Sequence, residues 1–340
     1  MKTDNITIKD IAKALNLSYS TVSRALKGSY KISEATREMV KQYASAHHYR
    51  PNLMAQSLKN KKSHCIGVVL CSIPNNFFAE VLSGIESIAY NKDYLLIITQ
   101  NLESYEREVR NLDNLTWRSV DGLLVSLSTE TTDISHFKQL HDQGLPIVFF
   151  DRVTDAIQTH QVITDNIGGA YNATSHLIER GYKRIATITS SPQISITRER
   201  LDGYKNALTE HNIAVNDRYI KYCPHGGMMI EEIESALDEL LQCPEPPDAL
   251  LTASDRITIG ACSLIRKKGL QIPRDIAVAG FSNFNAPELF DPPLTTIRQS
   301  AFEMGKIATD LLIQLIESKR PVTSFEKKVL PTELIVRSST

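Results

Sequence analysis

Residues 7–28 read Thr-Ile-Lys-Asp-Ile-Ala-Lys-Ala-Leu-Asn-Leu-Ser-Tyr-Ser-Thr-Val-Ser-Arg-Ala-Leu-Lys-Gly, and their spacing predicts two short helices joined by a turn. Ile8 and Ile11 recur at the spacing of one helical face. Thr7 stands in the N-cap position of the first helix, and Asp10, three residues later, completes a capping box. We therefore expect a first helix of about two turns.

The second predicted helix begins at Tyr19, after a turn in which Ser18 can accept hydrogen bonds from the first backbone amides. Gly28 ends it, because glycine tolerates the left-handed conformation that closes many helices. A step of about 100° per residue gives this helix two different faces. The apolar face holds Val22, Ala25 and Leu26, and the polar face holds Tyr19, Ser20, Ser23, Arg24 and Lys27.

Two helices of this kind are typical of a helix-turn-helix that reads the major groove of DNA. Arg24 can make the paired hydrogen bonds that recognise a guanine edge, while Tyr19 and Ser20 lie at the end that enters the groove. Thr21 and Ser23 suit phosphate oxygens. The alternative is an ordinary surface corner built from two amphipathic helices.

The charge of the chain is divided unevenly. The 340 residues carry a net charge of -1, but residues 1–62 hold 12 Lys and Arg against 4 Asp and Glu, and the remainder holds 26 against 35. A basic head on an acidic body indicates a polyanionic partner for the head alone. The alternative is a basic face that is merely solvated.

The sequence gives no sign of a membrane span, a metal or a cofactor. The N-terminus, Met-Lys-Thr-Asp-Asn, lacks an apolar signal core, and no later run is as long as a membrane span requires. We therefore expect a cytoplasmic protein. The cysteines and histidines lack the close spacing of metal ligands, and the chain has neither a phosphate-binding glycine loop nor a nucleophile elbow. We expect no metal, no cofactor and no enzyme activity.

A third helix is predicted after the first two, with Ser33 as its cap and Pro51 as its end. The side chains expected to close a small three-helix core are Ala35, Val40, Tyr43, Ala44 and Ala46. Residues 52–59 predict a very short helix, too short to be stable alone in water. It would need a second subunit and DNA, and Leu58 could then act as an apolar wedge in the minor groove. The alternative is an ordinary linker.

From Cys65 onward, short apolar runs alternate with amphipathic stretches. The predicted strands are 65–71, 94–99, 122–126, 147–150, 185–188, 249–252 and 276–279, and the predicted helices include 78–91, 104–117, 168–180, 198–211, 230–241, 256–268 and 301–317. Apolar strands separated by helices predict parallel sheets covered on both faces. The length favours two doubly wound α/β subdomains, in which ligands bind at the carboxyl ends of the strands.

That rule selects the residues that follow each strand as a candidate ligand site. They are residues 72–78, Asp151, Arg152, residues 190–200, Ser254, Asp255, Ser282 and Asn283. Carboxylates and arginines can bind vicinal hydroxyls, and Phe77 or Phe78 can cover an apolar ring face, so a polyhydroxylated ligand is expected. For each residue the alternative is a helix cap or an interdomain ion pair, above all for Asp165 and Arg198.

These residues resemble those of the lactose repressor and galactose repressor family of bacterial transcription regulators over essentially the whole chain. The matching stretches are Thr7-Ile-Lys-Asp-Ile-Ala12, Ser20-Thr-Val-Ser-Arg-Ala-Leu26, Tyr49-Arg-Pro-Asn52, Ala55-Gln-Ser-Leu58, Asn76-Phe-Phe-Ala79, Phe150-Asp-Arg152, Arg200-Leu-Asp-Gly-Tyr204, Ser254-Asp255 and Pro293-Leu-Thr-Thr-Ile297. The resemblance implies a headpiece at 1–50, a hinge helix and linker at 51–63, and a periplasmic-binding-protein-like core at 64–340. Within the core we expect one subdomain at about 64–162 and 292–323 and another at about 163–291 and 324–340, with three chain crossings between them.

The resemblance also implies roles for single residues. Tyr19, Ser20 and Arg24 fall on base-reading positions; Thr7, Thr21, Ser23, Lys27, Lys31 and Ser33 fall on phosphate or flanking contacts; and Asn52, Ala55 and Leu58 fall on hinge contacts. Phe77, Phe78, Asp151, Arg200 and Asp255 fall on effector positions, which Arg152 and Ser282 adjoin. One departure is Ser282, where many members carry an aspartate, so no known member's effector transfers directly.

The expected function is a ligand-responsive repressor that binds a pseudo-palindromic operator as a homodimer. No leucine-rich tail follows Glu333-Leu-Ile-Val-Arg-Ser338, so we expect a dimer rather than a tetramer. A sugar-type effector is expected first, and a purine or nucleoside is the alternative. From other classes, the rivals are a solute-binding protein for transport and a sugar-active enzyme that uses Asp151 and Asp255.

Overall fold

The computed structural model describes residues 6–49 and 62–340. The chain forms two compact units, residues 1–63 and residues 64–340, and each is described by itself. The short helix predicted at 52–59, with Asn52, Ala55 and Leu58, lies outside the described residues. Within the described ranges, no helix is long and apolar enough to cross a membrane.

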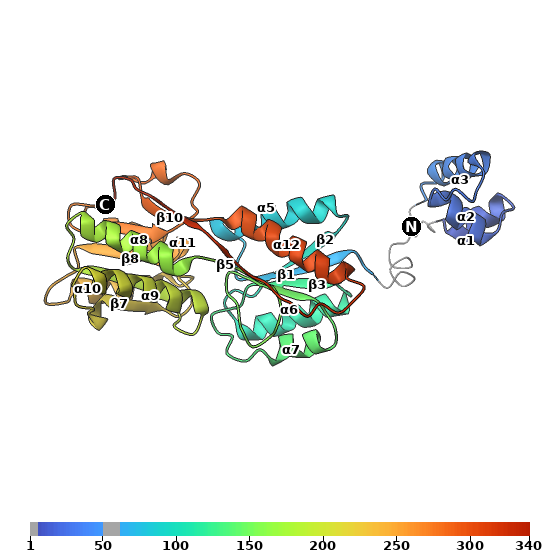
Figure 1. The fold of residues 1–340 in the computed structure, drawn as a ribbon. Helices are drawn as coiled ribbons and strands as arrows, with labels where there is room; N and C mark the ends of the chain where they lie inside the picture. The colour runs from blue at the N-terminus through green and yellow to red at the C-terminus, as the bar shows by residue number, and fades with distance from the viewer. Residues whose placement is uncertain (1–5, 50–61) are drawn as a thin grey trace. The chain divides into compact units, whose positions relative to one another are not determined.

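The first unit contains three helices among its described residues, α1 (Ile8–Ala14), α2 (Tyr19–Leu26) and α3 (Glu34–Ala46) (Figure 1). The predicted helix-turn-helix is confirmed, and α2 begins at the predicted residue. The core of this unit is made by Ile11, Ala12, Val22, Ala25, Val40 and Ala44. Leu17, in the turn between α1 and α2, packs against this core.

The third helix differs from its prediction in two respects. Ala35 and Ala46 are exposed, because they lie across the helix from Val40 and Ala44, which face the core. The helix ends at Ala46, before Pro51 is reached. His48 adopts a left-handed φ of 52°, and the amide of Tyr49 donates to the carbonyl of Ala44, which closes the last turn.

The second unit contains two six-stranded sheets in its described residues, 64–340, and the predicted division into two α/β subdomains is confirmed. The first sheet has the order β11-β5-β4-β3-β1-β2, and all its strands are parallel. Its strands are β1 (Cys65–Leu70), β2 (Leu95–Gln100), β3 (Gly122–Val125), β4 (Ile147–Phe150), β5 (Gln161–Thr164) and β11 (Lys327–Leu330).

The second sheet has the order β12-β10-β9-β8-β6-β7 and is parallel except for β12, which runs antiparallel to β10. Its strands are β6 (Ile185–Ser190), β7 (Ile220–Cys223), β8 (Ala249–Thr252), β9 (Ala277–Phe281), β10 (Thr295–Gln299) and β12 (Thr332–Ile335). We call the part of the core around each sheet the first lobe and the second lobe.

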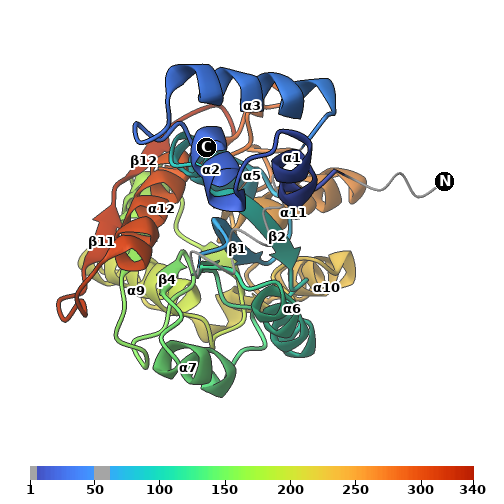
Figure 2. The same cartoon turned by 90° about the vertical axis from the view of Figure 1, so that its right-hand side faces the viewer.

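Helices cover both faces of each sheet, which explains why the strands are continuous apolar runs. In the first lobe, α5 (Asn76–Asn91) and α12 (Ala301–Glu317) pack on one face, and α6 (Tyr105–Trp117) and α7 (Ser135–Asp142) pack on the other (Figures 1 and 2). In the second lobe, α8 (Asn166–Glu179) and α9 (Ser195–Glu210) cover one face, and α10 (Ile230–Leu241) and α11 (Asp255–Lys267) cover the other. Two 3-10 turns, Asp217–Tyr219 and Pro287–Leu289, complete the described elements.

The chain passes between the lobes three times, as expected: between β5 and α8, between β10 and α12, and between β11 and β12. Two segments lie in the opposite lobe from the one predicted. β10 belongs to the second sheet although 292–323 was assigned to the first subdomain, and β11 belongs to the first sheet although 324–340 was assigned to the second. The reason is that β10 pairs with β9 of the second sheet before the chain crosses to α12, and β11 pairs with β5 of the first sheet before the chain crosses to β12.

Candidate DNA-reading face and effector cleft

The helix-turn-helix is held by two side-chain caps. Thr7 donates its backbone amide to Asp10 Oδ2 at 2.8 Å and accepts the amide of Asp10 on Oγ1 at 3.3 Å, so the predicted capping box is present. Ser18 Oγ accepts the amide of Thr21 at 3.1 Å at the start of α2. These contacts fix the angle at which α2 leaves the turn.

The polar face of α2 is presented outward. Tyr19 is 52% exposed, and Ser20, Arg24 and Lys27 are exposed as well, while Thr21 and Ser23 are half-buried. Such a face leaves the Arg24 guanidinium able to reach base edges. Lys31 is exposed, and Ser33 caps α3 by accepting the amide of Thr36 at 3.3 Å. Thr7 and Ser33 therefore both lie at helix N-termini, where phosphate oxygens bind favourably.

The carboxyl ends of the two sheets meet in the core, and Asp255 joins them. Asp255, the first residue of α11, accepts the backbone amide of Phe77 from the first lobe at 3.2 Å. It also accepts Ser282 Oγ at 2.5 Å and the amide of Asn283 at 2.9 Å from its own lobe. Burial raises the pKa of Asp255 above its ordinary value, although these hydrogen bonds oppose the rise. Asp255 thus links the two lobes.

Asp151 and Arg200 face this junction from opposite lobes. Asp151 follows β4 with a left-handed φ of 59°, which is uncommon outside glycine, and Ser126 Oγ donates to its Oδ2 at 3.5 Å. Burial raises the pKa of Asp151, and the charges of Arg152 and Arg200 oppose that rise. A strained, buried carboxylate between two guanidinium groups is typical of functional sites.

Arg200, on α9, is buried and held by three hydrogen bonds. Its Nε donates to Asn166 Oδ1 at 2.8 Å, its Nη1 to the carbonyl of Ala253 at 2.5 Å and its Nη2 to Gln299 Oε1 at 3.1 Å. The guanidinium lies 3.9 Å from the ring centre of Phe281. Burial lowers the pKa of Arg200 to about 10, so it stays charged near neutral pH.

Arg152 pairs with a carboxylate that the sequence did not single out. Its Nη1 donates to Glu103 Oε2 at 2.6 Å, and Glu103 also accepts Cys71 Sγ at 2.7 Å and the amide of Thr129 at 2.9 Å. Burial alone would raise the pKa of Glu103, but Arg152 and these hydrogen bonds bring it below its ordinary value. Glu103 and Arg152 therefore form a buried ion pair.

Three further contacts connect the lobes. Asn283 Nδ2 donates to Glu80 Oε2 at 2.8 Å, and Arg298 Nη2 lies 3.3 Å from the other carboxylate oxygen of Glu80. Arg256 Nη2 donates to Ser72 Oγ at 2.5 Å. The residues at the carboxyl ends of the strands therefore form a polar junction between the lobes, which we call the effector cleft.

The predicted effector residues are all buried, and several have internal partners. Phe77 and Phe78 are packed edge to face on each other, with ring centres 5.3 Å apart, and Phe78 packs on Phe150. Asp165 matches the helix-cap alternative that the sequence left open, because it caps α8 by accepting the amide of Gly168 at 2.8 Å. Arg198 is exposed and donates to the carbonyls of Pro192 and Gln193, which is neither a helix cap nor an interdomain ion pair.

Sequence reasoning missed Glu103, Asn166 and Gln299. Each follows or ends a strand of the cleft, so the rule that selected Asp151 would also have selected them. Asn166 and Gln299 were missed because β5 and β10 were not predicted. Glu103 was missed although the strand at 94–99 was predicted, because the residues after that strand were not considered.

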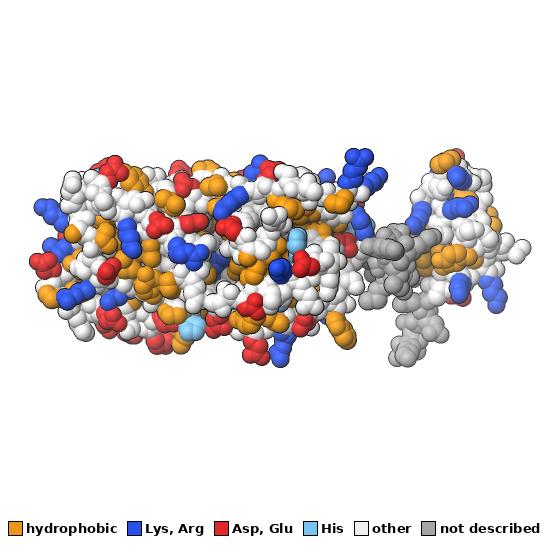
Figure 3. All heavy atoms as spheres, turned by 60° about the horizontal axis from the view of Figure 1, so that its bottom comes forward, with side chains coloured by type: hydrophobic (Ala, Val, Ile, Leu, Met, Phe, Trp, Pro, Cys, Tyr) orange, Lys and Arg blue, Asp and Glu red, His pale blue; other side chains and the backbone are white. Residues whose placement is uncertain are grey.

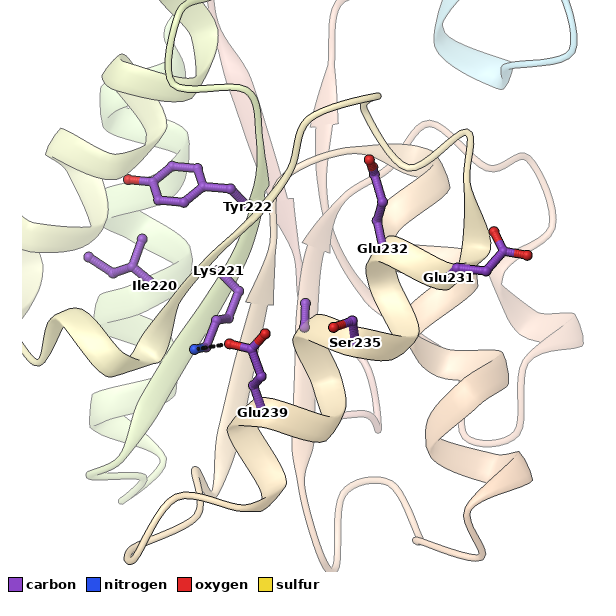
Figure 4. Close-up of a pocket in the computed structure, with 8 residues that line it drawn as sticks. Ile220, Lys221, Tyr222, Glu231, Glu232, Ser235 and Glu239 are labelled. Atoms are coloured by element: carbon purple, nitrogen blue, oxygen red, sulfur yellow. Dashed lines mark hydrogen bonds and ion pairs between the residues drawn. The ribbon is translucent and has the colours of Figure 1, made fainter.

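Among the hollows on the described part of the core, two differ in their relation to the cleft. One, of about 660 Å³, lies between the lobes and is lined by Ser128, Thr131, Arg152, Thr154 and Asp155 of the first lobe and by Gln193, Ser195, Arg198 and Glu199 of the second. Arg152 is the predicted effector residue that it contains. The other, of about 580 Å³, lies between β7 and α10, where Lys221 Nζ and Glu239 Oε2 are 2.6 Å apart (Figure 4).

One face of the core shows little segregation of charge. Acidic, basic and apolar side chains alternate over the face of the core seen in Figure 3. Among residues 6–49 and 62–340, no group of His, Cys, Asp and Glu side chains is arranged to hold a metal ion. In the cleft, by contrast, four charged side chains are less than a tenth exposed: Asp151, Arg152, Arg200 and Asp255.

Two family models match this sequence. Residues 7–52 match the bacterial regulatory proteins of the lacI family, and residues 174–340 match a periplasmic binding protein-like domain. The HTH-type transcriptional repressor PurR of Vibrio atlanticus is 32% identical over 335 residues, which cover 98% of each chain. The ribose operon repressor of Haemophilus influenzae is 33% identical over 336 residues, again 98% of each chain. Among solved structures, the lac repressor dimer bound to operator and the anti-inducer ONPF has a TM-score of 0.84 at 26% identity, with 99% of both chains covered.

Proposed function

The chain belongs to the lacI family of bacterial regulatory proteins, and from this premise we propose that it is a repressor whose affinity for its operator is set by a small effector in the cleft. The family resemblance noted in the motifs is confirmed, and so is the class of function, a ligand-responsive DNA-binding transcription regulator. The observation that carries the proposal is the outward polar face of α2, on a basic unit that folds apart from the core.

On DNA, α2 enters the major groove. We assign base reading to Tyr19, Ser20 and Arg24, and phosphate or flanking contacts to Thr7, Thr21, Ser23, Lys27, Lys31 and Ser33. The chain acts as a homodimer on a pseudo-palindromic site. The similar lac repressor is a dimer in its operator complex, which supports this assignment. Asn52, Ala55 and Leu58, in a hinge at 51–63 that follows a headpiece at 1–50, would contact the operator DNA.

The effector is a sugar or sugar derivative. Polar groups dominate the cleft, with Asp151, Arg152, Arg200, Asp255 and Ser282 within it, and such groups match hydroxyls. The rings of Phe77 and Phe78 are buried against each other, which leaves them poorly placed to stack on a base. A relative named for the ribose operon supports the same choice. The alternative within the family is a purine or nucleoside.

The rivals from other classes are less well supported. A solute-binding protein has no use for a helix-turn-helix, and an enzyme that used Asp151 and Asp255 would need them free, whereas Asp255 already accepts three hydrogen bonds. A DNA-bound repressor without enzyme activity, acting in the cytoplasm where its operator lies, accounts for both units of the chain.

The effector acts by linkage. It binds between the lobes. It can stabilise one relative orientation of the lobes over another to the extent that its contacts with the protein differ between the two orientations. The contacts of Asp255 with Phe77, and of Asn283 with Glu80, connect the lobes and would change with that orientation. A change in the relative orientation of the lobes alters the spacing of the two headpieces of the dimer, and this spacing sets the affinity for the operator.

Operator selection from random DNA tests this function. The purified protein is used with and without a panel of sugars and nucleosides, and the bound sequences are recovered. We expect a palindromic site whose recovery changes with one compound. Failure to select any sequence under all conditions would contradict specific DNA reading and leave the solute-binding protein as the better interpretation.

A further inference from the structure

Glu103 lies at the edge of the cleft opposite the three chain crossings. The crossings are at the β11-β5 edge of the first sheet and the β12-β10 edge of the second, whereas Glu103 follows β2 and Gly226 follows β7, the strands at the other edges. A Cβ atom placed on Gly226 would lie 3.0 Å from Glu103 Oε1. The two lobes therefore meet at Glu103, where the cleft opens.

Three buried side chains around Glu103 carry polar atoms without hydrogen-bond partners. Thr129 Oγ1, Arg152 Nε and Ser190 Oγ find no hydrogen-bond partner within the part of the chain that the structure describes, and each of these residues is less than a tenth exposed. Arg152 Nε lies 3.9 Å from Asp151 Oδ2, which is an ion-pair distance but too long for a hydrogen bond. Thr129 and Arg152 bind Glu103 directly through other atoms, and Ser190 Oγ lies 3.5 Å from the same Cβ position on Gly226. A buried polar atom that lacks a hydrogen-bond partner destabilises the fold. Because three such atoms lie around the Glu103 carboxylate, this is a place where a ligand can supply the missing hydrogen bonds.

The chemistry of these atoms suits hydroxyl groups. The two hydroxyls can donate or accept, and Arg152 Nε can only donate. A ligand hydroxyl both donates and accepts, so a set of hydroxyls can serve all three atoms.

The charges at the same place disfavour an anion. Glu103 is 2% exposed, and Arg152, the guanidinium beside it, is already paired with Glu103 at 2.6 Å and lies 3.9 Å from Asp151. A phosphate group would meet the Glu103 carboxylate at short range, and the nearby guanidinium is already neutralised.

We propose that Glu103, with Thr129, Arg152 and Ser190, forms a subsite for an uncharged, hydroxyl-bearing end of the effector, and that Glu103 excludes phosphorylated effectors. This inference rests on the proposed effector response of the same cleft. The ligand is then an uncharged sugar or ribose-bearing compound rather than its phosphate ester. Glu103 is the side chain that discriminates between the two.

Paired ligands test the discrimination. The full-length protein is titrated with D-ribose and ribose 5-phosphate, glucose and glucose 6-phosphate, and cytidine and its 5′-phosphate, and calorimetry is combined with operator binding for each. For the pair that the protein recognises, we expect the phosphate to bind at least about tenfold more weakly. In Glu103→Gln the ratio should fall below about threefold, mainly because the phosphate binds more tightly.

A matched control is Glu108→Gln, because Glu108 is another buried carboxylate of the first lobe that binds Asn101, Ser128 and Thr131 instead of Arg152. It should leave the ratio unchanged. Thr129→Val and Ser190→Ala provide a second measurement that does not depend on the folding of the Glu103 variant. Because each removes an unpaired hydroxyl, the melting temperature should stay or rise while affinity for the uncharged ligand falls about threefold or more.

The outcomes separate this inference from the function on which it rests. A phosphorylated compound that binds as tightly as its parent and changes operator affinity would overturn the role of Glu103 and leave the regulator intact. Equal weakening of both members of a pair in Glu103→Gln would show a structural role only, and would also overturn the inference. Specific operator binding that no compound of either class alters would overturn the effector response and this inference with it.

Discussion

Buried charges in this protein are paired across short distances. Glu103 is matched by Arg152, and Asp151 lies between Arg152 and Arg200. Removing one member of such a set leaves an uncompensated charge, which is far more costly than the pair itself is stabilising. Arg200→Ala is therefore a poor test of effector binding, because loss of its contacts with Asn166 and Gln299 would also weaken the fold.

Arg24 gives the clearest test of base reading. It is exposed on α2, so Arg24→Ala should leave the fold intact, weaken operator binding by about 1–3 kcal/mol and relax the preference at one base pair. Fluorescence anisotropy with single-base operator variants measures both effects. Lys31→Ala is the control, since an exposed lysine that binds phosphate should weaken all sequences alike. A uniform loss in Arg24→Ala would refute base reading.

His160 predicts a pH dependence of stability. Its Nδ1 accepts the amide of Glu326 at 2.9 Å, which requires the neutral ring, and burial lowers the pKa of His160 below 6.5. As the pH falls, the unfolded chain therefore protonates His160 at a higher pH than the folded chain does. The contribution of the neutral His160 to stability is lost as the pH falls from about 7 through 6.5 toward the lowered pKa. Melting temperatures between pH 7.5 and 5.5 should fall more steeply in the wild type than in His160→Asn. Parallel curves would show that His160 does not titrate in this way.

At the scale of elements, α5 and α12 form a close helix contact in the core. A Cβ on Gly84 would overlap the carbonyl oxygen of Phe302, and one on Gly305 would overlap that of Val81. These glycines let the two backbones approach directly, and the buried side chains of both helices then cover one face of the first sheet.

Gly84→Ala should therefore destabilise the core by about 1–3 kcal/mol or more, through overpacking. The sign of the change in unfolding free energy is informative, because replacing glycine by alanine in the middle of a helix ordinarily stabilises the helix by about 0.5–1 kcal/mol. Urea unfolding of the full chain measures the change. Ser83→Ala, at the exposed neighbouring position, serves as the control and should change stability little. A Gly84→Ala variant as stable as the wild type would mean that the helices can separate without cost.

The elements that could be predicted from the sequence are those with a strong apolar pattern. β1, β4 and β8 are buried along their length, and their apolar runs marked them. β7 and β11 have mixed patterns, Ile-Lys-Tyr-Cys and Lys-Lys-Val-Leu, because they lie at sheet edges where one side is solvated. Caps were predictable as well, because Thr7, Ser18 and Ser33 act through local hydrogen bonds.

The candidate site was predictable to the extent that its residues followed predicted strands. Asp151 and Asp255 were found in this way. Glu103 could have been selected by the same rule, since it follows the predicted strand at 94–99, but its pairing with Arg152, 49 residues away, could not be predicted because only the fold brings the two together. Long-range pairing of this kind leaves no local pattern in the sequence.

At the scale of the whole core, three chain crossings join the lobes at one edge of the sheets, while Glu103 and Gly226 meet at the other. A change in the angle between the lobes about the crossings would produce its largest displacement at the far edge. Gly226 is therefore the position at which a small addition should interfere most with closure of the cleft.

Gly226→Ala should shift the core toward an open arrangement. The added methyl group would lie 3.0 Å from Glu103 Oε1, and overpacking of this kind costs about 1–3 kcal/mol, which corresponds to roughly 5- to 150-fold weaker effector binding if the whole cost falls on the closed form. Small-angle X-ray scattering should also show a larger radius of gyration. Gly269→Ala is the matched control, since Gly269 has a similarly left-handed φ of 78° but nothing within 4 Å of the added atom. If both variants lose effector affinity equally, backbone strain accounts for the effect and the contact with Glu103 does not govern closure.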